Sequence, residues 1–108
     1  MKCNANKIFE WYVQQVQAFI DSPKVEQFLV GITANEKNRR YAYKKKNFKY
    51  FILLDTNMSK EDALKFEEDL FTKFKDNKKY HSDKKKSSYK PSTGGVDHDC
   101  YSLYIAAF

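Results

Sequence analysis

The sequence lacks any apolar run long enough to cross a bilayer. Apolar stretches such as residues 28–30 and 51–54 fall far short of the roughly 20 residues that a membrane-spanning helix requires. The first residues also lack the pattern of a signal peptide. These absences argue against a membrane partner and lead us to expect a cytoplasmic protein.

Cysteine and arginine are both scarce. The chain has two cysteines, Cys3 and Cys100, and a single possible bridge is not the dense disulfide framework of a small secreted domain. We therefore expect two free thiols. The two arginines, Arg39 and Arg40, are adjacent, and lysine supplies every other basic side chain apart from histidine.

What the chain does contain is enough apolar and aromatic material for one core. Its 108 residues are 42% hydrophobic and 17% aromatic, which predicts a single domain over residues 1–108. The net charge of +6 is concentrated in residues 37–49 and 73–90. Such segments attract a polyanion, although a solvated lysine-rich surface has the same composition.

The order of hydrophobic patterns predicts an α+β fold, a small three-stranded antiparallel sheet flanked by helices, with an additional helix at the N-terminus. Asn35 and Ser59 are suitable helix caps, and Asp62 completes a start resembling a capping box. The predicted helices cover residues 8–20, 36–45 and 59–74, the strands cover 25–33, 47–55 and 100–108, and a long lysine-rich loop covers 76–98.

Glu67 is out of place for a solvated carboxylate. At about 100° per residue, it falls within the apolar arc of the third helix, which contains Ala63, Phe66, Leu70 and Phe74. A carboxylate turned inward needs a cation, a metal or hydrogen-bond donors. A glutamate at the edge of the apolar arc, or an ion pair with Arg39, would explain the same pattern.

The paired arginines point to phosphate, because guanidinium groups offer planar bidentate donors. Tyr43 follows Arg39 by four residues and so shares its helix face. The alternative is an ordinary surface arginine stacked on a tyrosine.

These residues together resemble a known family. The segment FLVGIT at residues 28–33, then Arg39 eight residues after Gly31, Tyr43 four residues later, and Glu67 on a later helix resemble the middle and end of a GIY-YIG nuclease domain. The resemblance covers about residues 27–74. It implies a divalent metal, Mg²⁺ or Mn²⁺, on Glu67 and a phosphate-binding role for Arg39.

Two positions depart from that family. Leu29 stands where the YIG tyrosine would be, and no GIY triplet precedes it. In a permuted arrangement the last strand would take the vacant edge of the sheet and bring Tyr101 or Tyr104 beside Gly31.

The resemblance implies a metal-dependent endonuclease, a hydrolase of nucleic-acid phosphodiesters acting on DNA rather than RNA. Tyr43, or else Tyr104, would position or deprotonate water. The alternative is a module without activity that binds nucleic acid or a protein partner, such as a phage or mobile-element inhibitor. The residues expected to bind nucleic acid are Arg40, Lys44, Lys45, Lys46, Lys84, Lys85 and Lys86.

Overall fold

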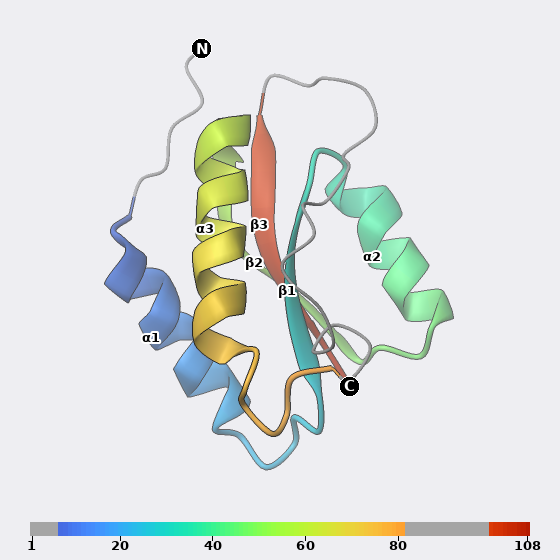
Figure 1. Ribbon diagram of the computed structural model, residues 1–108. Coiled ribbons are helices and arrows are strands. Elements are labelled where there is room, and N and C mark those ends of the chain that lie inside the picture. Colours follow the sequence, from blue (N-terminus) through green and yellow to red (C-terminus); the bar gives the residue numbers. More distant parts are fainter. Residues whose placement is uncertain (1–6, 82–99) are drawn as a thin grey trace.

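The computed structural model describes residues 7–81 and 100–108 (Figure 1). These residues form helices and strands in the predicted order, and the expected α+β class with a three-stranded antiparallel sheet is confirmed. The elements are α1 (Phe9–Ile20), β1 (Phe28–Thr33), α2 (Glu36–Lys45), β2 (Tyr50–Met58), α3 (Lys60–Phe74) and β3 (Tyr101–Ala107).

The last strand lies at the centre of the sheet. The spatial order is β1-β3-β2, and β3 pairs antiparallel with both neighbours. The expectation that this strand would take a vacant edge is therefore wrong, although it does lie beside β1. All seven residues of β3 are buried, because it has a strand on each side and helices over both faces.

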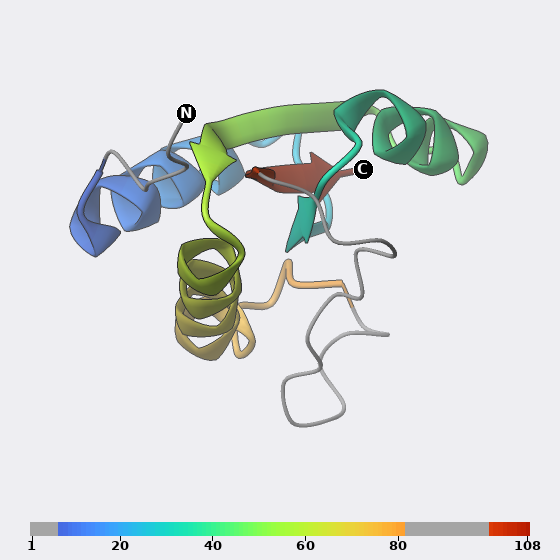
Figure 2. The ribbon, with the colours of Figure 1, turned by 90° about the horizontal axis from the view of Figure 1, so that it is seen from above.

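The helices cover the two faces unequally. Seen along the strands, α1 and α3 lie on one side of the sheet and α2 on the other (Figure 2). The α3 side forms the main core, with Phe28 against Phe74 and the fully buried Leu70. Tyr12 of α1 is also fully buried and donates a hydrogen bond of 2.5 Å to Asp55.

Both predicted helix caps are confirmed. The side-chain oxygen of Asn35 accepts from the Asn38 amide at 3.0 Å, and Ser59 Oγ accepts from the Asp62 amide at 3.1 Å. Each contact pairs a backbone amide that the first helical turn leaves without a partner. Polar side chains therefore fix where α2 and α3 begin.

Two strands begin later than predicted. Val25 is buried but lies in a turn, where its amide bonds to Ser22, so β1 starts only at Phe28. Asn47 has a φ of 69°, a left-handed conformation that delays the start of β2 to Tyr50. Register shifts after Leu53 and Asp55 then let β2 continue to Met58.

The first residues of the predicted loop pair with the sheet. Tyr80 forms a parallel bridge with Phe28, whose amide and carbonyl bond to Lys79 and His81. Residues 79–81 thus cover part of the outer edge of β1. The remainder of the predicted loop, residues 82–98, lies outside the described residues.

Cys100 is disulfide-bonded, so the expectation of free thiols is wrong. The chain has one other cysteine, Cys3, which lies outside the described residues. A pattern of two cysteines far apart in sequence could not reveal this pairing. None of the helices in the described ranges is long and apolar enough to cross a membrane.

Candidate functional site

The site is built around Gly31, where β1 lies directly opposite Tyr104 of β3. A Cβ atom added at Gly31 would lie 2.6 Å from Tyr104 Cζ and still closer to its Oη. No side chain larger than hydrogen fits there unless the tyrosine moves. Because Gly31 has no side chain, the Tyr104 ring can lie directly against the backbone of β1.

Tyr104 meets a second tyrosine from the helix above it. Its Oη lies 2.9 Å from Tyr43 Oη, and either oxygen is able to donate. The Tyr104 ring stacks on Phe51 of β2 at 4.7 Å, and the Tyr43 ring packs edge-on against Phe48 at 4.8 Å. Aromatic packing thus fixes the position of both hydroxyls.

The surroundings of Tyr43 and Tyr104 change the pKa of each phenol. Burial raises the pKa of Tyr43, but its hydrogen bond with Tyr104 and the charge of Arg39 both lower it. Burial raises the pKa of Tyr104 further, and there the contact with Tyr43 raises it as well. Both phenols are therefore protonated at neutral pH, and either hydroxyl can donate the hydrogen bond that joins them.

Arg39 and Glu67 act on this pair from different helices. The positive charge of Arg39 lowers the pKa of Tyr43 and of Tyr104, whereas the negative charge of Glu67 raises both. Glu67 is only 4% exposed, as its position within the apolar arc predicts. Helices α2 and α3 flank opposite faces of the sheet, so whether the two side chains open into one cleft stays a prediction.

Tyr80 is a member of the site that the sequence did not reveal. Its buried hydroxyl accepts from the Val30 amide at 3.5 Å, and burial raises its pKa, with Glu67 and Tyr43 adding to the shift. The position depends on the parallel bridge to Phe28, 52 residues earlier in the chain. No local pattern around Tyr80 indicates that pairing.

The two adjacent arginines have different surroundings. Arg39 is half-buried near the tyrosine pair, whereas Arg40 is exposed and its guanidinium lies 5.0 Å from the centre of the Phe51 ring. Arginine does stack on an aromatic ring here, but it is Arg40 on Phe51. The alternative from the sequence was a surface arginine stacked on a tyrosine, whereas the stacked arginine is Arg40 and its ring is a phenylalanine.

The predicted nucleic-acid contacts on α2 face solvent. Lys44, Lys45 and Lys46 are exposed; Lys45 lies over the exposed Tyr41 ring at 4.8 Å and Lys46 over Tyr43 at 5.8 Å. Lys84, Lys85 and Lys86 lie outside the described residues. The described lysines thus form a basic surface that includes an exposed tyrosine.

Comparisons of the chain with family models, curated proteins and solved structures give no match.

Proposed function

We propose that the protein is a metal-dependent nuclease that hydrolyses nucleic-acid phosphodiester bonds, with DNA the expected substrate. The observation that carries this proposal is the Tyr43–Tyr104 hydroxyl pair, whose oxygens lie 2.9 Å apart, with Arg39 on the helix that supplies Tyr43 and the buried Glu67 on α3. A cation, a carboxylate and an acid–base pair are the groups that such hydrolysis needs. The GIY-YIG resemblance of the sequence supports the same function.

Tyr43 is the proposed base. Its oxygen is 2.9 Å from that of Tyr104, and the charge of Arg39 offsets part of the rise in its pKa that burial causes. Tyr43 would orient or deprotonate the attacking water, with Tyr104 stabilising the resulting negative charge. Arg39 would neutralise charge that develops on the phosphate oxygens.

The residues are compatible with one Mg²⁺ or Mn²⁺ ion bound together with substrate. The described residues contain no group of three His, Cys, Asp or Glu side chains suited to a metal, so a complete protein ligand set is not expected there. Mg²⁺ is commonly held by one or two carboxylates together with water and substrate phosphates. Glu67 would supply the carboxylate, and the ion when bound would stabilise the leaving oxygen.

The basic surface of α2 would hold the nucleic-acid backbone. Lys44 and Lys45 of α2 are exposed, so they can contact phosphates of a bound strand. Their contribution should be electrostatic and independent of sequence. Affinity is expected to fall steeply as salt concentration rises.

Incubation with plasmid DNA and Mg²⁺ or Mn²⁺ tests the activity. Arg39→Ala and Glu67→Gln should each lower the cleavage rate at least about 100-fold, as loss of a transition-state donor commonly does. Lys24→Ala serves as the control, because it removes an exposed cation that lies between α1 and β1, outside the site. Cleavage that persists unchanged in both site variants would identify a contaminating nuclease.

The stability of Glu67→Gln separates a metal ligand from a structural ion pair. If Glu67 holds metal, the variant should keep its melting temperature, and Mg²⁺ should raise that of the wild type alone. If Glu67 instead neutralises a buried cation, its loss should cost about 3–5 kcal/mol. A large loss of stability without a metal-dependent shift in the wild type would contradict the metal site.

A binding module without catalytic activity is the second candidate. Burial raises the pKa of both Tyr43 and Tyr104, which lowers the fraction of phenolate available as a base at neutral pH. Salt-sensitive binding of DNA without cleavage would favour a nucleic-acid module of this kind. Binding of a protein partner that is insensitive to salt would favour the inhibitor alternative.

A further inference from the structure

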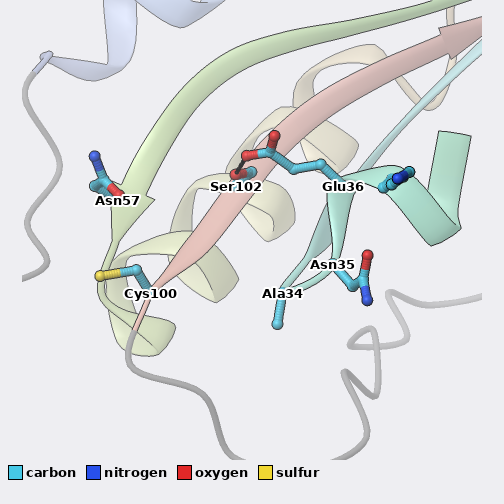
Figure 3. A pocket seen from close by; sticks show the side chains of 7 residues that line it. Ala34, Asn35, Glu36, Asn57, Cys100 and Ser102 are labelled. Atoms are coloured by element: carbon cyan, nitrogen blue, oxygen red, sulfur yellow. Dashed lines mark hydrogen bonds between the residues drawn. The ribbon is translucent and has the colours of Figure 1, made fainter.

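A polar hollow lies next to the tyrosine pair. It has a volume of about 390 Å³, within the range of about 300–1,000 Å³ that small-ligand pockets occupy. Figure 3 shows Glu36 reaching from α2 to Ser102 on β3, with Asn57 of β2 across the opening. The full lining is Ala34, Asn35, Glu36, Lys37, Asn57, Cys100 and Ser102.

The hollow continues the same surface as the site. Ser102 and Tyr104 are two residues apart on β3, so their side chains lie on one face at a spacing of about 6.6 Å. Glu36 and Tyr43 are seven residues apart on α2 and therefore share a helix face. Their bonds to Ser102 and Tyr104 follow in the same order along β3.

The chemistry of the lining selects among ligands. A bound anion would meet the carboxylate of Glu36, and a bound cation would meet Lys37 and the positive end of α2. A neutral ligand with both donors and acceptors avoids both conflicts. Glu36 offers acceptor oxygens, Asn57 offers a carboxamide with both kinds of group, and Ser102 already donates to Glu36 at 2.5 Å.

We propose that this hollow binds one unstacked nucleobase of a single strand and prefers adenine or cytosine; this rests on the proposed function. Both bases present an exocyclic amino group that a carboxylate accepts from, beside a ring nitrogen that a carboxamide can donate to. Thymine would instead turn a carbonyl oxygen toward Glu36. A base enters such a pocket only when it is out of the duplex stack. The substrate therefore presents an unpaired nucleotide beside the phosphodiester bond that is cleaved near Tyr43.

Binding of fluorescent oligo-dA, oligo-dC and oligo-dT tests the proposal. Strands of about 10 nucleotides suit a small domain, and leaving out divalent cations prevents cleavage. Reductant is omitted so that the Cys100 disulfide is kept. The wild type should bind oligo-dA or oligo-dC about 10-fold more tightly than oligo-dT, the difference that one good base contact supplies.

Glu36→Gln should remove that preference, because the amide nitrogen that replaces one carboxylate oxygen donates to a carbonyl and cannot accept from an amino group. Glutamine still accepts from Ser102, so the local fold is retained. Asn57→Gly is an independent variant: Asn57 has a φ of 58°, which glycine adopts without strain, so only the carboxamide is lost. Lys44→Ala with Lys45→Ala is the matched control and should weaken all three strands equally.

The outcomes distinguish this inference from the function on which it rests. Equal affinity of the wild type for all three strands, or a preference that survives both Glu36→Gln and Asn57→Gly, would overturn the base pocket while leaving nucleic-acid binding intact. Absence of binding to every strand, oligo-dT included, would overturn the base pocket, and if plasmid DNA is also not cleaved, the proposed function falls with it.

Discussion

Helices α2 and α3 flank the same sheet but are attached to it differently. In α3 five residues are buried, and they form much of the core. In α2 none is buried, and one face is held by the polar contacts of Glu36 and Tyr43 with β3. Helix α3 therefore stabilises the fold, whereas α2 can present most of its surface to a partner.

The largest expected effect is the loss of packing under α3. Leu70→Ala removes a fully buried side chain and should lower the free energy of unfolding by about 2–5 kcal/mol. Tyr41→Ala on α2, where the ring is 61% exposed, should change it by no more than about 0.5 kcal/mol. Urea denaturation measures both. Similar losses in the two variants would contradict the division between the helices.

Gly31→Ala should have the next largest effect, because the new methyl group collides with Tyr104. We expect a loss of about 1–3 kcal/mol, as in other overpacked interiors. The same change in a Tyr104→Leu background should cost less, since the obstructing ring is gone. A double-mutant cycle by chemical denaturation measures this coupling, and additive losses would show that the Tyr104 ring is not the obstacle.

Alkaline pH probes the buried tyrosines on both sides of the sheet. Burial raises the pKa of Tyr12, Tyr80 and Tyr104 above the ordinary value of 10.0. Above that value the unfolded chain loses protons that the folded chain retains, so stability is complete below about pH 10 and falls as pH rises. Thermal melts from pH 8 to 11 measure this loss.

Tyr104→Phe should make the alkaline decline shallower, because one of the retained protons is removed. Tyr41→Phe is the matched control on the exposed side of α2 and should leave the slope as it is in the wild type. An unchanged slope in Tyr104→Phe would contradict the raised pKa of Tyr104.

The smallest effects concern the two caps. Ser59→Ala and Asn35→Ala each remove one hydrogen bond at a helix start and should cost about 1 kcal/mol locally. Because α3 belongs to the core, the Ser59 change should appear in global unfolding. The Asn35 change should instead speed amide hydrogen exchange in the first turn of α2. Equal effects on global stability would show that the two helices unfold as one unit.

Much of the architecture was predictable because it follows from local patterns. The apolar arc of α3 predicted that Glu67 is buried, and the caps at Asn35 and Ser59 fixed two helix starts. The starts of β1 and β2 were placed too early, since buried residues such as Val25 occur in turns as well as in strands. The pairing of Tyr80 with Phe28 left no trace in the neighbouring sequence.

By itself, the sequence determined the order of elements, the basic character of α2 and the inward position of Glu67, because each depends on residues within a few turns of one another. Tertiary structure alone decided that β3 lies at the centre, that Tyr104 faces Gly31, and that Glu36 meets Ser102. These contacts join residues at least 43 positions apart, the separation of Met58 and Tyr101. Strand pairing selects them through the packing of the whole sheet, which no local periodicity records.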